Sequence, residues 1–284
     1  MYSITENSSL EGCCIEIDNT ELNLDKTLKC GQAFRWNKTP KGTWYGTIAD
    51  KLVALRQIDN KIYTNIKSSD ILCLVEYFDL TTDYTAEIGK LDLDNYARQS
   101  YEIGKGIHIL RQDLFETMVT FLMSQCNTMH NIKLIVNKLS VRFGNKVQIN
   151  WNNENIEYYT FPTLEQLRQA TLADLRACGM GFRAEYLMQM INKLDTNKNA
   201  LDSLRACSYT EAIKELTKFN GVGNKVANCI ALFGLHHVNA FPIDTHIKQI
   251  INKEYNGCID IKRYGQYAGI IQQYMFYNKT GGDN

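Results

Sequence analysis

Apolar and polar residues alternate in four short stretches of the first hundred residues. The stretches are separated by Asn, Gly, Pro and Asp, and they comprise residues 14–18, 43–48, 52–55 and 61–66. Alternation with a period of two, bounded by turn-forming residues, is typical of strands with one buried face. The pattern therefore predicts a mainly antiparallel sheet in this part of the chain, followed by a helix near residues 69–78.

The apolar period changes to that of helices after about Asp113. Leu114, Met118 and Leu122 recur at a spacing of four, which places them on one face of a helix. Further helices are predicted over residues 164–170, 172–178, 183–194, 209–219, 224–233, 245–251 and 264–277. We therefore predict an α+β protein, with a β-rich N-terminal domain carrying an antiparallel sheet (residues 1–108) and a mostly α-helical domain (residues 109–284).

Two glycines, Gly221 and Gly223, join two of the predicted helices. Glycine permits positive φ and close approach of another backbone, and the first NH groups of the following helix have no partner within the helix. Such NH groups suit a phosphate. A Gly-x-Gly between helices is usually only a turn, however, so this feature alone leaves phosphate binding open.

Lys225 lies in the first turn of the second helix, where the helix dipole amounts to about half a positive charge. This position disfavours the charged ammonium, and partial desolvation would disfavour it further. Both effects favour the neutral amine that a nucleophilic or Schiff-base lysine needs. A solvated surface lysine would look the same in the sequence, so that interpretation stays open here.

Asp244 follows an apolar segment and precedes the helix predicted from Thr245, so it can cap that helix. A carboxylate fixed in this way can stabilise a cationic transition state. Aspartate caps are common without any catalytic role. The proximity in sequence of the glycine hairpin and Lys225 is what makes Lys225 and Asp244 candidate catalytic residues.

The composition of the chain restricts how it could bind phosphates, in which compartment it works and whether it spans a membrane. The chain has 31 basic and 31 acidic residues, so phosphate binding would need local devices rather than a basic surface. Its nine cysteines show no spacing typical of disulfides or zinc, which favours a reducing compartment. The most apolar stretches, such as residues 229–235, are too short to span a bilayer. We therefore expect a cytoplasmic monomer that contacts no membrane.

Two segments, residues 221–229 and 241–246, resemble the helix-hairpin-helix DNA glycosylases, and among them the 8-oxoguanine DNA glycosylases. The resemblance covers nearly the whole chain, because further matching segments occur in family order at residues 30–36, 110–113, 179–186 and 272–276. It implies a bifunctional DNA glycosylase and lyase that excises 8-oxoguanine from double-stranded DNA in base excision repair, at the nucleoid if the source is prokaryotic. Lys225 would attack the anomeric carbon and form a Schiff base that undergoes β-elimination, while Asp244 would stabilise the charge that develops on the sugar.

The same resemblance implies a pocket for the extruded base. The carbonyl of Gly31 would accept the ring NH that 8-oxoguanine has and guanine lacks. Cys229 and Phe276 would sandwich the base, and Gln272 would read its Watson–Crick edge. On composition alone, Cys229 and Phe276 could equally be core residues.

Contacts to the DNA backbone would come from Gly221, Gly223 and His246, by the same resemblance. No cofactor is then required, no side-chain metal site is expected, and a structural metal ion could be held by carbonyls of the hairpin around residues 221–223. A surface histidine would be indistinguishable from His246 in the sequence.

The chain departs from the family where eukaryotic relatives carry an asparagine run and then an arginine that reads the base opposite the lesion. Asn127 alone matches the asparagine run and would contact the DNA, and the arginine position falls on Asn131. An asparagine lacks the bidentate fork of arginine, so we expect a relaxed preference for the opposite base. Phe182 replaces an intercalating tyrosine, and Arg183 would contact the orphaned strand.

Three alternatives compete with this hypothesis. An alkylpurine glycosylase that uses aspartate alone is disfavoured by Lys225. A relative with an iron–sulfur cluster needs four closely spaced C-terminal cysteines, whereas only Cys258 lies beyond the hairpin segment. A noncatalytic DNA-binding module that uses only the hairpin remains open to experiment.

Overall fold

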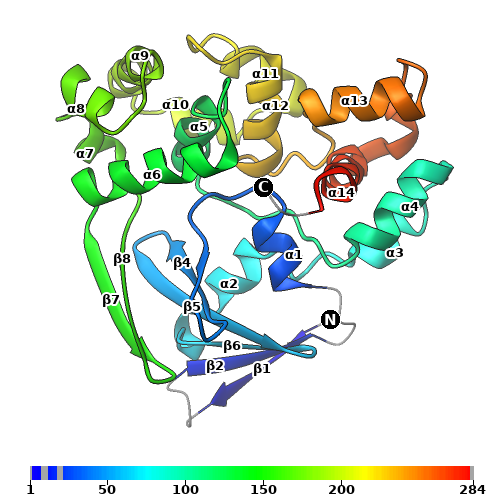
Figure 1. The fold of residues 1–284 in the computed structure, drawn as a ribbon, viewed down its shortest axis with the longest axis horizontal. Coiled ribbons are helices and arrows are strands. Elements are labelled where there is room, and N and C mark those ends of the chain that lie inside the picture. The colour runs from blue at the N-terminus through cyan, green and yellow to red at the C-terminus, as the bar shows by residue number, and fades with distance from the viewer. Residues whose placement is uncertain (1, 8–11, 18–21, 282–284) are drawn as a thin grey trace.

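The predicted antiparallel sheet is confirmed by a computed structural model, which describes residues 2–7, 12–17 and 22–281 (Figure 1). In the described part the main sheet has the strand order β1-β2-β6-β5-β4-β3, and every neighbouring pair is antiparallel. The strands are β1 (Tyr2–Asn7), β2 (Gly12–Ile17), β3 (Asn37–Lys38), β4 (Trp44–Ile48), β5 (Lys51–Ile58) and β6 (Lys61–Thr64). Asp18, at the end of the first predicted strand, lies outside the described residues.

One face of the sheet is covered by α1 (Leu24–Lys29) and by α2 (Leu72–Tyr77), which follows the short 3-10 helix η1 (Ser68–Asp70) (Figure 1). Buried apolar side chains from both helices share a core with the sheet residues Trp44, Val53 and Leu55. This packing fixes the end of α1, from which the chain enters the region of Cys30 and Gly31.

The predicted helices of the fold are also confirmed, with ends that differ from the predicted ones by a few residues, whereas the helices at residues 84–88, 95–104 and 200–205 were not predicted. The helical part comprises α3 (Tyr84–Ile88), α4 (Asn95–Gly104), α5 (Leu114–Leu122), α6 (Met129–Phe143), α7 (Leu164–Leu167), α8 (Leu172–Ala177), α9 (Arg183–Thr196), α10 (Ala200–Arg205), α11 (Tyr209–Leu216), α12 (Asn224–Phe233), α13 (Thr245–Glu254) and α14 (Ala268–Thr280). The helix predicted over residues 264–277 is interrupted: the 3-10 helix η2 (Ile261–Tyr267) precedes α14, because Gly265 has φ 52° and ψ −134°.

A β-hairpin lies inside the domain that was expected to be mostly helical, in a stretch for which no helix was predicted. β7 (Lys146–Trp151) pairs with β8 (Glu154–Tyr159), and the hairpin packs on the main sheet (Figure 1). Its Trp151 and Ile156 form a small core with Leu52 and Ala54 of β5. The alternating sequence of β7 was a strand signal that the prediction missed.

The largest core joins residues from both sides of the predicted domain boundary at 108/109. Tyr84, Ile88 and Ala97, which precede it, are buried with residues of α5, α12 and α14. The contact between α4 and α14 is close, since a Cβ added at Gly104 would lie 2.6 Å from the ring of Tyr274. The boundary stays a prediction, and it does not divide the hydrophobic core.

Within the described residues, no helix combines the length and the apolar character needed to cross a membrane.

Candidate active site

The hairpin between α11 and α12 depends on Gly221. This residue has φ 81°, and an added Cβ would lie 2.6 Å from Cδ2 of Tyr186 and 2.9 Å from Cδ1 of Leu122. Its carbonyl accepts a hydrogen bond from the side-chain amide of Gln125. Gly223 is different: it has φ −84°, it is the N-cap of α12, and a Cβ there would meet no atom within 4 Å. The N-terminus of α12 is therefore open to an approaching ligand.

Lys225 is half-buried in the first turn of α12, as predicted. Its Nζ donates a hydrogen bond to Oγ of Ser124 at 3.1 Å and lies 5.8 Å from the centre of the Phe121 ring. One turn further, burial raises the pKa of the Cys229 thiol to about 11, although the nearby Lys225 opposes this shift. Cys229 is therefore a neutral thiol at physiological pH.

Asp244 caps α13, which confirms the predicted capping. Its Oδ1 accepts a hydrogen bond from the backbone NH of Ile247 at 2.8 Å. The segment before it is held against α14, because the NH of Gly269 donates to the Val238 carbonyl at 2.8 Å and a Cβ on Gly269 would lie 2.4 Å from the Ala240 carbonyl oxygen. This close approach brings Asp244 beside the face of α14 that carries Gln272.

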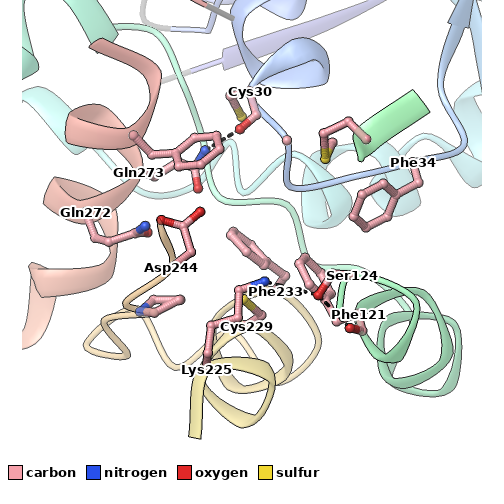
Figure 2. Close-up of a pocket in the computed structure, with 14 residues that line it drawn as sticks. Cys30, Phe34, Phe121, Ser124, Lys225, Cys229, Phe233, Asp244, Gln272 and Gln273 are labelled. Atoms are coloured by element: carbon pink, nitrogen blue, oxygen red, sulfur yellow. Dashed lines mark hydrogen bonds between the residues drawn. The ribbon is translucent and has the colours of Figure 1, made fainter. Parts of the chain in front are cut away.

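One pocket contains all six residues predicted for catalysis and base binding (Figure 2). Lys225 and Cys229 enter it from α12, Asp244 comes from the start of α13, and Gln272 comes from α14. Gly31 and Phe276 complete the predicted set. Residues from distant parts of the sequence thus converge on one pocket.

Gly31 is constrained by backbone conformation and by space. It has φ 84°, and a Cβ would lie 3.2 Å from Cε1 of Phe276 and 3.7 Å from Cε of Met129. Gln272, which faces the same space, is 4% exposed, and its Oε1 is buried without a hydrogen-bond partner among the described residues. A buried acceptor of this kind is costly unless a ligand donates to it.

Several lining residues were not predicted. Ser124 contacts Lys225, and its only sequence signal was the polar interruption that it begins after the apolar helix. Gln273 donates to the Cys30 carbonyl at 2.6 Å; it lies in the matching segment 272–276, of which only Gln272 and Phe276 were assigned to the pocket. The remaining unpredicted lining residues are Cys30, Phe34, Phe121, Met129, Phe233 and Pro242.

A wider groove adjoins the pocket and shares Lys225 and Asp244 with it. Among the residues predicted to contact DNA, Asn127, Gly221, Gly223 and His246 line this groove. The ring of His246 meets the Phe276 ring edge-on, with 5.5 Å between ring centres. The amide nitrogen of Asn127 donates to the Met123 carbonyl, so this side chain partly folds back on its own loop.

Phe182 and Arg183, the other two predicted DNA contacts, lie outside the set of groove-lining residues. Phe182 is 54% exposed, as a wedge residue needs to be. Arg183 is only 8% exposed; its guanidinium donates to the carbonyls of Gln125 and Cys126 and lies 4.5 Å from the Phe182 ring. In this arrangement Arg183 holds the loop before α6, and its DNA contact stays a prediction.

The described residues contain no group of three His, Cys, Asp or Glu side chains that could hold a metal ion. A metal ion held by backbone carbonyls alone is a separate case, because such a site needs none of these side chains. At the hairpin, the Gly223 carbonyl already accepts the NH of Ala227 and the Gly221 carbonyl accepts the amide of Gln125.

Two family models match the chain in succession. The model described as "8-oxoguanine DNA glycosylase, N-terminal domain" matches residues 14–118, and "HhH-GPD superfamily base excision DNA repair protein" matches residues 119–264. An Arabidopsis thaliana protein named N-glycosylase/DNA lyase OGG1 is 31% identical over 92% of this chain and 78% of its own length. A Saccharomyces cerevisiae N-glycosylase/DNA lyase is 30% identical over 94% of this chain and 86% of its own length.

Solved structures agree with these sequence matches. The apo-form of the Clostridium acetobutylicum 8-oxoguanine glycosylase/lyase is 32% identical, covers 98% of both chains and has a TM-score of 0.88. The same enzyme in complex with double-stranded DNA containing cytosine opposite 8-oxoguanine has a TM-score of 0.89 at 30% identity, over 100% of this chain and 99% of that one.

Proposed function

Because the chain belongs to the HhH-GPD superfamily of base excision DNA repair proteins, we propose that it is a bifunctional DNA glycosylase and abasic-site lyase that excises 8-oxoguanine from double-stranded DNA. The observation that carries this proposal is the convergence of Lys225 and Asp244 on one pocket with Gly31, Gln272 and Phe276. The matched relatives carry the names of enzymes with both activities.

In the proposed reaction the Lys225 amine forms a bond to the anomeric carbon as the bond from that carbon to the base breaks. The Asp244 carboxylate, fixed by its capping hydrogen bond, stabilises the positive charge on the sugar during this exchange. Ring opening converts the adduct into a Schiff base, and loss of a C2′ proton then expels the 3′ phosphate. Ser124 accepts a hydrogen bond from Lys225 and so orients the amine toward the pocket.

The residues that line the pocket would select 8-oxoguanine over guanine. The target bond is inaccessible in stacked DNA, so the nucleotide must leave the helix and enter the pocket. There Cys229 and Phe276 would contact the two faces of the ring. The Gly31 carbonyl would accept the N7–H of 8-oxoguanine, and guanine would leave this carbonyl unpaired.

Binding to the DNA backbone would depend on a few local groups of the protein, since the chain has equal numbers of acidic and basic residues. The free NH groups at the start of α12 can receive a phosphate, and His246 lies in the same groove. A metal ion at the hairpin would need further carbonyl or water ligands beside those of residues 221–223, and it remains a proposal. We propose that the protein acts on DNA in the cytoplasm, and at the nucleoid if the source is prokaryotic.

Opposite-base selection should be weak. Asn131 is exposed, and the neighbouring Met129 and His130 line the groove without supplying a bidentate donor. We expect excision of 8-oxoguanine opposite each of the four bases at similar rates. Single-turnover excision assays on the four duplexes measure these rates. Strong exclusivity for cytosine would contradict this expectation.

Borohydride trapping tests the central proposal. Wild-type protein is incubated with a duplex containing 8-oxoguanine and reduced, and a covalent protein–DNA adduct is expected. Lys225→Gln should abolish the adduct while duplex binding persists, and Asp244→Asn should slow its formation. Absence of an adduct with every oxidised-purine duplex would overturn the proposal and favour a noncatalytic DNA-binding module.

A further inference from the structure

Gln273 is a second amide side chain of the pocket, beside Gln272 on α14, and it is only 2% exposed. Its Nε2 donates a hydrogen bond to the Cys30 carbonyl at 2.6 Å. A carbonyl oxygen can only accept, so the amide must present its NH₂ end to Cys30. Figure 2 shows the opposite end, the amide oxygen, inside the pocket on the side where Asp244 lies.

The amide oxygen of Gln273 has no donor among the described residues. It faces a space that is already rich in acceptors, because Gln272 has a buried unpaired Oε1 and Asp244 contributes a carboxylate. Acceptors that face one another across a narrow pocket are stable only when donors, from water or from a ligand, lie between them. The pocket therefore fits a ligand with several N–H groups.

The orientation of Gln273 is not free to adapt. Turning the amide over would set its oxygen against the Cys30 carbonyl and leave that carbonyl without its donor. Cys30 itself is 1% exposed, so water cannot easily replace the lost hydrogen bond. Gln273 consequently offers an acceptor to the pocket and cannot offer a donor.

We propose that Gln273 is a specificity-determining residue whose Oε1 accepts an N–H of the extruded base, while its Nε2 fixes the peptide that presents Gly31. This inference rests on the proposed function and deepens it. 8-Oxoguanine has N–H donors at N1, at N7 and on its exocyclic amine, and guanine lacks the N7–H. A base that places a lone pair opposite Gln273 is rejected.

The test measures binding in a Lys225→Gln background, in which cleavage does not interfere. Four duplexes are compared: one with 8-oxoguanine, and three with a base that lacks one donor. 8-Oxohypoxanthine lacks the exocyclic amine, 2-amino-8-oxopurine lacks N1–H, and guanine lacks N7–H. Gln273→Met removes the amide at similar length, and Gln32→Met is the matched control, because Gln32 holds the same segment through the carbonyls of Thr27 and His108 without lining the pocket.

Gln273→Met is expected to weaken binding to the 8-oxoguanine duplex about 3- to 10-fold, the size of one hydrogen bond. For one of the three donor-deficient bases this loss should vanish, which identifies the N–H that Gln273 accepts. Gln32→Met should change the affinity for all four duplexes by the same factor. Equal losses on all four duplexes with Gln273→Met would overturn the proposal, since the amide would then act only by holding Cys30.

A second variant keeps the test decisive if Gln273→Met lowers the melting temperature too far. Gln273→Glu keeps oxygen acceptors and loses the donation to Cys30, so it should bind all duplexes more weakly and retain the dependence on base donors. Loss of that dependence would count against the proposal. Failure of the proposed function gives a different result: a protein with Gln273 intact would not prefer the 8-oxoguanine duplex to the guanine duplex.

Discussion

The two hairpin glycines provide a matched pair of substitutions. Gly221→Ala places a Cβ on a residue with φ 81°, which costs roughly 1–2 kcal/mol for an L-residue. The same Cβ would lie 2.6 Å from the Tyr186 ring and 2.9 Å from Leu122, and overpacking of this kind costs about 1–3 kcal/mol. The free energy of unfolding should therefore fall by about 2–5 kcal/mol, which lowers the melting temperature of a chain of this length by roughly 3–8 °C.

Gly223→Ala introduces the same methyl group two residues later. Its φ of −84° suits alanine, and no atom lies within 4 Å of the added Cβ. Only the weaker N-cap preference of alanine counts against it, at about 0.5 kcal/mol. The methyl group would nevertheless stand at the open N-terminus of α12, so duplex binding should weaken although the fold is kept.

Urea and thermal unfolding of the two variants, followed by circular dichroism, check the stabilities, and fluorescence anisotropy with an 8-oxoguanine duplex checks binding. Unfolding free energies that are equal for Gly221→Ala and Gly223→Ala would refute the packing explanation. Unchanged duplex affinity in Gly223→Ala would refute the assignment of the α12 N-terminus as a phosphate site.

Three further predictions concern the pocket and the core. Gly31→Ala should lower affinity for the 8-oxoguanine duplex at least tenfold, because its Cβ enters the pocket 3.2 Å from Phe276; a titration that matches wild type would contradict this. Burial, together with the nearby Arg111, lowers the pKa of His236 below its ordinary value of about 6.5. The folded protein therefore favours the neutral imidazole, whose contribution to stability is fully present above about pH 6.5 and is lost as the pH falls through the lowered pKa. Urea unfolding at several pH values should show less acid destabilisation in His236→Asn, in which asparagine suits the φ of 55° and stays neutral; parallel pH curves would exclude this cause. Iodoacetamide at pH 8 should alkylate the exposed Cys126 well before Cys229, whose pKa is raised to about 11, and mass spectrometry showing equal rates would contradict the buried neutral thiol.

Some of the tertiary arrangement could not be read from local patterns. Arg183 follows Phe182, which matches the intercalating tyrosine of the family and so suggested a DNA contact, but its guanidinium is occupied by the carbonyls of Gln125 and Cys126. These partners lie far from Arg183 in the sequence, so the residues around Arg183 do not predict them. Gln273 was missed for the same reason, since its partner Cys30 lies near the other end of the chain.

The sequence by itself determined the local structure around the two candidate catalytic residues. The limits of α12 and the capping of α13 by Asp244 were predicted correctly, because helix periodicity and capping depend on hydrogen bonds between residues three or four positions apart. Family resemblance, also read from sequence, named the residues of the base pocket. Only the tertiary structure decided that these residues share one pocket, that the β7–β8 hairpin packs on the main sheet, and that Gln273 turns its amide oxygen into the pocket. Those results depend on contacts between segments that are remote along the chain, and their energies come from packing and desolvation that no local pattern encodes.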